Sequence, residues 1–227
     1  MMSSKKGISS HQLCRVLEVQ YKSAWFLAHR IREAMRSGDL APFGSGGGAV
    51  EVDETYFVNK KGAVRGRGYG HKMGVLALVD RDSGKMRTFA FEKINGADVN
   101  AIVRANISIE ARLMTDEARM YRTIGKEFAE HGTTLHSIGN YVNAKDRTIH
   151  TNTVEGAFSI FKRGMKGVYQ HCGQKHLHRY LAEFEFRYTN REAAGFNDTA
   201  RSSRAIKGIV GKRLTYGTTN ASSNGDR

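Results

Sequence analysis

The kind of secondary structure that the chain encodes changes once along its length, and this order restricts the fold more than any other feature. Three segments are apolar or alternate apolar with polar residues, as β-strands do: 49–58, 71–80 and 85–92. From residue 96 onward the patterns predict helices at 96–107, 119–132, 153–167 and 175–192, and strands at 111–118 and 133–139. An antiparallel meander followed by strand–helix units predicts an α/β fold in which helices flank a mixed five-stranded sheet.

The first 38 residues carry two helical patterns joined by a short turn. They have the form of a helix-turn-helix, whose second helix offers cations to phosphates at Lys22, Arg30, Arg32 and Arg36. A helical hairpin packed on the main domain would give the same pattern. Residues 39–48 hold the only proline and several glycines and are expected to form a linker. The main domain would then span 49–200, followed by a basic, largely disordered tail at 201–227.

The charge of the chain indicates its partner. The 227 residues include 36 Lys and Arg against 22 Asp and Glu, a formal net charge of +14, which favours a polyanion such as nucleic acid. Cys14 and Cys172 stand far apart, which argues against a disulfide framework or a zinc knuckle and fits a reducing compartment. Because no apolar run approaches the roughly 20 residues of a membrane-spanning helix, we expect a cytoplasmic, nucleoid-associated protein without a membrane partner.

Three carboxylates lie where metal-dependent chemistry would need them. Asp53 lies within the first strand, Asp116 ends the fourth, and Glu155 is near the start of the helix at 153–167. If the first and fourth strands are parallel neighbours, about 4.8 Å apart, the two aspartates could share a divalent cation. Without a cation the carboxylates would repel, and at least one pKa would rise. Oxygen ligands suit Mg²⁺ or Mn²⁺ rather than zinc, and two such ions support phosphodiester chemistry.

Each of these acids also has a purely structural interpretation. Asp53 could be a charge at a strand end. Asp116 could cap a helix that begins near Arg119, which is a common role for aspartate. Glu155 could close a capping box with Asn152, three residues earlier.

The helix at 153–167 divides its residues between two stripes. One is apolar, and the other holds Glu155, Ser159, Lys162 and Lys166 at spacings of four, three and four. Lys162 is therefore two turns, about 10.5 Å, beyond Glu155 on the same face, where it could hold a phosphate beside bound metal. A solvated charged face would show a similar periodicity.

Several longer motifs are shared with a known family. They are "VEVDETYFVNKKG" followed by "GRG", "TDEARMY", "HTNTVEGAFSIFKRGMKGVYQHCGQKHLHRYLAEFEFRYTNR" and "GKRLTY". The chain resembles, from about residue 8 to 216, the transposases of the IS1595 insertion-sequence group, with their ISXO2-like transposase domain. The resemblance implies an RNase H-like fold and DDE-type chemistry with two divalent metals. It assigns the catalytic positions to Asp53, Asp116 and Glu155, with Lys162 as the lysine that follows the third acid.

The resemblance also predicts partners and a function. The expected function is that of a DNA transposase that cuts transposon ends and joins them to target DNA, acting as a homodimer or larger assembly on double-stranded DNA. Longer members carry a cysteine-rich zinc ribbon that this chain lacks, so a truncated N-terminus is expected. The residues expected to bind DNA are Lys22, Arg30, Lys60, Lys61, Arg65, Arg67, Lys72, Arg163 and Lys166. The alternatives are an inactive DNA-binding relic and another RNase H-like nuclease.

Overall fold

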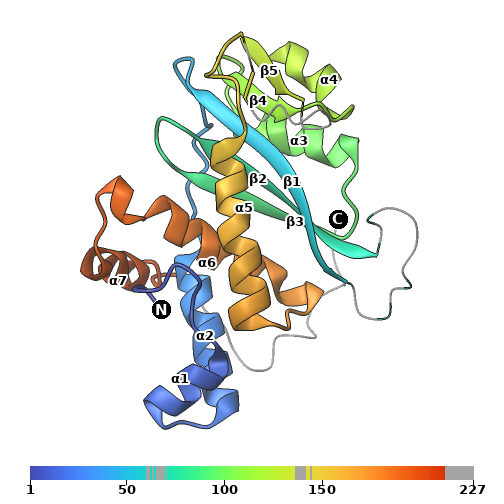
Figure 1. Ribbon diagram of the computed structural model, residues 1–227. Helices are drawn as coiled ribbons and strands as arrows, with labels where there is room; N and C mark the ends of the chain where they lie inside the picture. Colours follow the sequence, from blue (N-terminus) through green and yellow to red (C-terminus); the bar gives the residue numbers. More distant parts are fainter. Residues whose placement is uncertain are drawn as a thin grey trace, which may run out of the picture.

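The computed structural model describes residues 1–59, 62, 64, 69, 71–135, 142, 143 and 145–212. In this part of the chain, a five-stranded sheet is covered by helices on both faces (Figure 1). The strands are β1 (Ala49–Asn59), β2 (Lys72–Asp80), β3 (Met86–Phe91), β4 (Arg112–Asp116) and β5 (Glu130–Thr134). The α-helices are α1 (Ser10–Leu17), α2 (Tyr21–Met35), α3 (Gly96–Asn106), α4 (Tyr121–Ile124), α5 (Asn152–Gly164), α6 (Leu177–Thr189) and α7 (Asp198–Lys207). None of the described helices combines the length and apolarity that crossing a bilayer requires.

The sheet is mixed, with strand order β3-β2-β1-β4-β5. β1, β2 and β3 form the expected antiparallel meander, whereas β4 pairs in parallel with both β1 and β5. The turn between β2 and β3 is closed by Asp80, whose Oδ1 accepts from the backbone N–H groups of Asp82 and Ser83 at 3.0 and 3.3 Å. Gly84 completes this turn at φ +65°, which a side chain would disfavour. The predicted α/β fold with a mixed five-stranded sheet is therefore confirmed.

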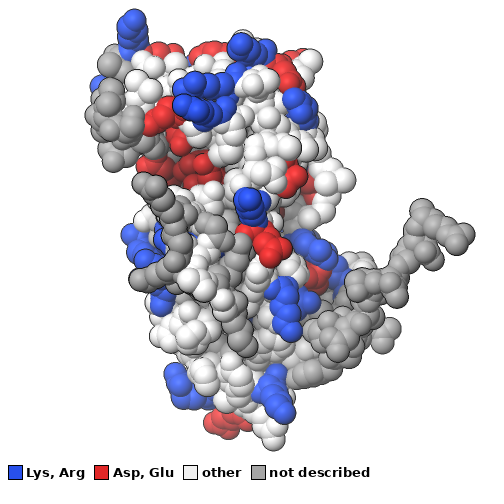
Figure 2. All heavy atoms as spheres, turned by 90° about the vertical axis from the view of Figure 1, so that its right-hand side faces the viewer, with Lys and Arg blue, Asp and Glu red and all other residues white. Residues whose placement is uncertain are grey.

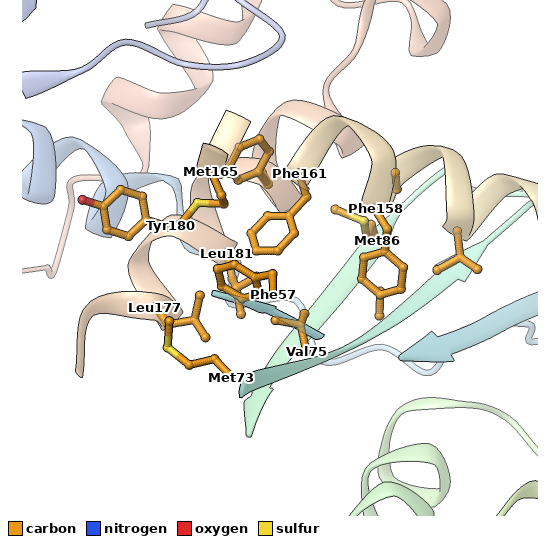
Figure 3. Close-up of a cluster of buried hydrophobic side chains, with 14 of the residues drawn as sticks. Phe57, Met73, Val75, Met86, Phe158, Phe161, Met165, Leu177, Tyr180 and Leu181 are labelled. Atoms are coloured by element: carbon orange, nitrogen blue, oxygen red, sulfur yellow. The ribbon is translucent and has the colours of Figure 1, made fainter. Parts of the chain in front are cut away.

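One face of the sheet packs against α5 and α6 (Figures 1 and 3). The apolar stripe predicted from periodicity is buried there: Val154, Ala157, Phe158 and Phe161 of α5, and Met165 directly after it. It meets residues from all three meander strands, among them Phe57, Val75 and Met86. The rings of Phe57 and Phe161 lie edge to face with centroids 4.8 Å apart. This contact fixes α5 against the strand that carries Asp53.

The opposite face packs against α3 and α4. Val50 and Val52 of β1 are fully buried there, together with Val99 and Val103 of α3 and Tyr121 of α4. Because side chains alternate along a strand, the neighbouring residues Glu51, Asp53, Thr55 and Phe57 point to the α5 face. The alternation of β1 thus places the charged residues Glu51 and Asp53 on the face of the sheet that α5 covers.

The N-terminal helices pack on the C-terminal ones. α1 ends at Leu17, and Glu18 turns the chain with a left-handed φ of 52° before α2 begins. Leu13, Ala24 and Ala28 form a small core between α1 and α2. α2 then packs on α6 and α7, where Met35, Phe186 and Ala205 are buried together.

The two segments expected to be irregular are partly ordered. Within residues 39–48, Phe43 is buried against the α3 face of the sheet, and its N–H donates to the carbonyl of Asn106 at 2.8 Å. The Arg87 guanidinium lies over the Phe43 ring, 4.2 Å from its centroid. Beyond residue 200, the chain continues α7 to Lys207, and Asn197 caps this helix by accepting from the N–H of Ala200.

The predicted helix at 119–132 is wrong. The structure has only the four-residue α4 and a 3₁₀ turn at Gly125–Glu127, after which β5 begins at Glu130, three residues before the predicted strand. Gly125 and Gly132 interrupt the segment, and helix is the less favourable state for glycine. A Cβ on Gly132 would come within 2.6 Å of the Met114 sulfur, so this glycine is needed where β5 passes β4.

Candidate active site

Asp53 and Asp116 lie on neighbouring parallel strands. The β1–β4 register pairs Ala49 with Arg112, Val50 with Leu113 and Glu51 with Met114. Continued by two residues, this register brings Asp53 opposite Asp116, at the point where β4 ends. The first and fourth strands are thus parallel neighbours, which was the condition for the two aspartates to lie together.

The surroundings of Asp53 disfavour its ionised form. Burial raises the pKa of Asp53 to about 8, and the negative charges of Glu54, Asp116 and Glu155 add to the increase. A hydrogen bond from the Glu54 N–H to Asp53 Oδ1, at 2.8 Å, acts in the opposite direction. All three predicted acids therefore lie near enough for the charges of Asp116 and Glu155 to affect Asp53.

Glu54 is a fourth carboxylate, which is not among the predicted site residues. It follows Asp53 in β1 and accepts a hydrogen bond of 2.6 Å from the Tyr121 hydroxyl of α4. Burial raises the pKa of Glu54 to about 7, opposed by this hydrogen bond and reinforced by Asp116. The only sequence signal for it was the acidic pair at 53 and 54, because nothing local to Glu54 points to a tyrosine 67 residues away.

Glu155 lies in the first turn of α5, but no capping box forms. Asn152 is the first residue of the helix rather than its cap, and the N-cap position belongs to Thr151. The Thr151 hydroxyl donates to Glu155 Oε1 at 2.9 Å, while the Glu155 N–H makes an ordinary helical bond to the Thr151 carbonyl. The interpretation of Glu155 as part of a capping box is therefore wrong. Its carboxylate remains on the helix surface, near enough to Asp53 to raise the pKa of that residue.

Asp116 is likewise not a helix cap. Met120 occupies the N-cap position of α4, and Asp116 Oδ1 instead accepts from the Ala118 N–H at 3.0 Å in the turn after β4. This hydrogen bond orients the carboxylate at the end of the strand.

The three acids are satisfied by protein donors in this conformation. Among the described residues, no three His, Cys, Asp or Glu side chains form a group that could hold a metal ion. Asp53, Asp116 and Glu155 accept from Glu54 N–H, Ala118 N–H and the Thr151 hydroxyl, respectively. Their chemistry nevertheless suits a hard divalent cation, because all three are oxygen donors, and Asp53 is desolvated beside the negative charges of Asp116 and Glu155.

A second acidic residue of β1 is buried on the same face as Asp53. Glu51 is fully buried, and its carboxylate accepts from Arg81 Nε at 2.7 Å and from the backbone N–H of Val154 at 2.8 Å. His150 Nδ1 lies 3.3 Å from Glu51 Oε1. The sequence signal for Glu51 was its position two residues before Asp53, on the same side of the strand.

The predicted DNA-binding residues are found in several places. On α5, Lys162 is half-buried and Arg163 is exposed, and Lys166 is exposed in the turn that continues the helix. Lys72 begins β2, with its Nζ 5.1 Å from the centroid of the Tyr69 ring. Lys22 and Arg30 of α2 are exposed, as expected. Four further residues lie outside the described part of the chain: Lys60, Lys61, Arg65 and Arg67.

Arg32 was also expected to reach phosphates, and this is wrong. Its side chain is completely buried and paired with Glu183 of α6.

Charges are distributed unevenly over the surface. Figure 2 shows acidic side chains gathered in the upper half of one face, with Lys and Arg around and below them.

The mixed five-stranded sheet with helices on both faces is an RNase H-like fold, the fold class expected from the sequence. The family model described as the ISXO2-like transposase domain matches residues 46–189, and the chain belongs to this family of insertion-sequence transposases. The resemblance noted from the motifs is thereby confirmed. The family implies a nuclease or transferase enzyme with DNA as its partner. No curated protein matches the sequence.

Proposed function

We propose that this protein cuts the ends of a DNA transposon and joins them to target DNA, with Asp53, Asp116 and Glu155 as ligands of Mg²⁺ or Mn²⁺. The observation that carries the proposal is the parallel register of β1 and β4, which brings Asp116 close to the desolvated carboxylate of Asp53. The bound ions would compensate these charges, activate the attacking hydroxyl and stabilise the leaving oxygen.

The contacts of the acids suggest how the site is arranged. The N–H groups of Glu54 and Ala118 hold one oxygen each of Asp53 and Asp116. The remaining carboxylate oxygens are then oriented by the backbone before any ligand arrives. Glu155 would exchange the Thr151 hydroxyl for the cation.

Cations would hold the DNA backbone beside the acids. Lys162, two helical turns from Glu155, would bind a phosphate next to the scissile bond, and Arg163 and Lys166 would bind neighbouring phosphates. Lys72 and the loop residues Lys60, Lys61, Arg65 and Arg67 would contribute further contacts. Lys22 and Arg30 of the exposed part of α2 would contact the transposon end, as the helix-turn-helix interpretation of residues 1–38 requires.

Joining two transposon ends to one target requires two active sites in one complex. We therefore propose that the protein acts on DNA as a homodimer or a larger assembly. Mass measurement of the complex with DNA ends would show this as two or more chains per complex.

The test uses purified protein and labelled duplexes that carry candidate transposon ends, with Mg²⁺ or with EDTA. A transposase releases a 3′-hydroxyl end and then joins it to a second DNA, whereas an RNase H-like nuclease cuts without joining. A DNA-binding relic would shift the duplex in a gel without nicking it. Metal-dependent cleavage that survives Asp53→Asn or Asp116→Asn would contradict the assigned site.

A further inference from the structure

Glu51 carries a fully buried carboxylate that is not used by the proposed chemistry. Both of its oxygens are occupied: Oε1 by Arg81 Nε at 2.7 Å, with His150 Nδ1 at 3.3 Å, and Oε2 by the Val154 N–H at 2.8 Å. A buried charge of this kind is strongly unfavourable unless it is paired and hydrogen-bonded. Since protein donors surround this carboxylate, it is not itself available to a metal ion.

Arg81 extends the contacts of Glu51 to the segment that enters α5. It directly follows β2, and its Nη1 donates to the carbonyl of Thr148 at 2.6 Å. Its Nη2 donates to the carbonyl of His150 at 2.7 Å. One guanidinium thus connects β1, the β2–β3 turn and the segment before α5.

The hydrogen bond that the Val154 N–H donates to Glu51 links a neighbour of Asp53 to a neighbour of Glu155. Val154 belongs to the first turn of α5, whose N–H groups have no partner within the helix, and a carboxylate is favoured at this end of the helix dipole. Glu51 lies two residues before Asp53, and Val154 lies one residue before Glu155. This contact therefore couples the position of Glu155 to that of Asp53 through the start of α5.

We propose that Glu51, together with Arg81, is a positioning residue that fixes the start of α5 so that Asp53 and Glu155 can bind the same divalent cation. This inference rests on the proposed function. Glu51 acts through the backbone of α5 and touches neither DNA nor metal. Residues that orient metal ligands in this way commonly change metal affinity about 10- to 100-fold when they are substituted.

The experiment compares Glu51→Ala, Glu51→Gln and Arg81→Met with Glu183→Gln. Glu183 is a matched control, because it is also completely buried and paired with arginine, but it lies in α6 and contacts α2. Three quantities are measured: exchange protection of the Val154 amide without metal, Mn²⁺ affinity by calorimetry, and the Mg²⁺ concentration that gives half-maximal cleavage.

For Glu51→Ala we expect loss of exchange protection at the Val154 amide. The Mn²⁺ affinity should fall at least tenfold, the Mg²⁺ concentration for half-maximal cleavage should rise at least tenfold, and the DNA affinity should be unchanged. Compared with Glu51→Ala, Glu51→Gln should restore part of the Val154 protection and part of the metal affinity, because its amide oxygen can still accept from the Val154 N–H. Arg81→Met should weaken metal binding, and Glu183→Gln should leave it unchanged despite lower stability. If Glu51→Ala does not fold, Glu51→Gln and Arg81→Met decide the outcome.

Two results would overturn the inference. One is a folded Glu51→Ala or Arg81→Met variant with wild-type metal dependence, which would leave Glu51 with a role in stability alone. The other is equal loss of Mn²⁺ affinity in Glu183→Gln. A wild-type protein that binds Mn²⁺ without cleaving DNA would contradict the proposed function instead, and the Mn²⁺ affinities of the variants would still decide the role of Glu51.

Discussion

Arg32 of α2 and Glu183 of α6 form an ion pair that is completely buried, with 2.7 Å between Nε and Oε2. The second Glu183 oxygen accepts from the Tyr169 hydroxyl at 2.7 Å and lies 3.1 Å from Arg187 Nη2. The Arg32 guanidinium is also stacked over the Tyr180 ring, 4.2 Å from its centroid. The N-terminal helix pair is thus attached to the main body of the protein through buried charges.

Glu183→Ala should destabilise the protein strongly. It would leave Arg32 and Arg187 as buried cations without their anion, which typically costs about 3–5 kcal/mol. Urea denaturation measures this as a lower free energy of unfolding. Glu127→Ala is the control, since the Glu127–Arg104 pair is exposed and little change is expected from its loss. Equal effects of the two substitutions would show that the buried pair has no special role.

Asp53→Asn should have opposite effects on activity and on stability. Metal-dependent cleavage should fall below detection, because a ligand of the proposed site is lost. Without metal, the variant should melt at a higher temperature than the wild type at pH 9, where the wild-type protein must bear an ionised, desolvated Asp53 beside other carboxylates. A lower melting temperature would indicate that Asp53 stabilises the fold, contrary to its proposed role.

Glu185 should make stability decrease as the pH rises. Burial raises its pKa to about 7, and its carboxylate accepts from the N–H and hydroxyl of Thr88. Because the folded-state pKa exceeds the unfolded value, the contribution of Glu185 is fully present below pH 4.5 and is lost as the pH rises through 7. Glu185→Gln should therefore be more stable than the wild type at pH 8, by on the order of 3 kcal/mol, and similar to it at pH 4. Thermal melts of both proteins over this range measure the difference.

Two glycines of α5 should respond oppositely to alanine. Gly156 has open space where a Cβ would lie, so Gly156→Ala should stabilise the helix by about 1 kcal/mol. At Gly164 a Cβ would lie 2.4 Å from the Phe184 ring and 2.9 Å from the Lys6 carbonyl, so Gly164→Ala should destabilise the protein. The midpoints of chemical denaturation compare the two variants directly. Stabilisation by both would mean that α6 moves away from α5 at little cost.

Lys162→Gln should weaken DNA binding in a salt-dependent way. Loss of one phosphate contact should reduce the slope of log affinity against log salt by about 1, with no change in Mn²⁺ affinity. Lys126, exposed in the 3₁₀ turn after α4, provides the control, and Lys126→Gln should keep the wild-type slope. Titrations at several salt concentrations measure the slopes, and equal slopes for all three proteins would remove Lys162 from the DNA interface.

Periodicity was most reliable where the pattern was long and unbroken. The meander at 49–92 and the helices α3, α5 and α6 were predicted nearly to their ends. The segment 119–132 was not, because two glycines interrupt it and the pairing of β5 with β4 outweighs its helical pattern. The adjacency of Asp53 and Asp116 depended on the pairing of β1 with β4, which the sequence left open. The contact of Tyr121 with Glu54 had no local signal at all.

The sequence by itself determined the order of strands and helices, the apolar stripe of α5 and the positions of the three candidate acids, since these are local patterns. Only the tertiary structure decided which charged residues are buried. Arg32 and Glu51 look like surface charges in the sequence, yet their partners are 151 and 103 residues away. The physical reason is that a charge can be buried only where distant segments supply its counter-ion or hydrogen-bond donors, which no local pattern encodes.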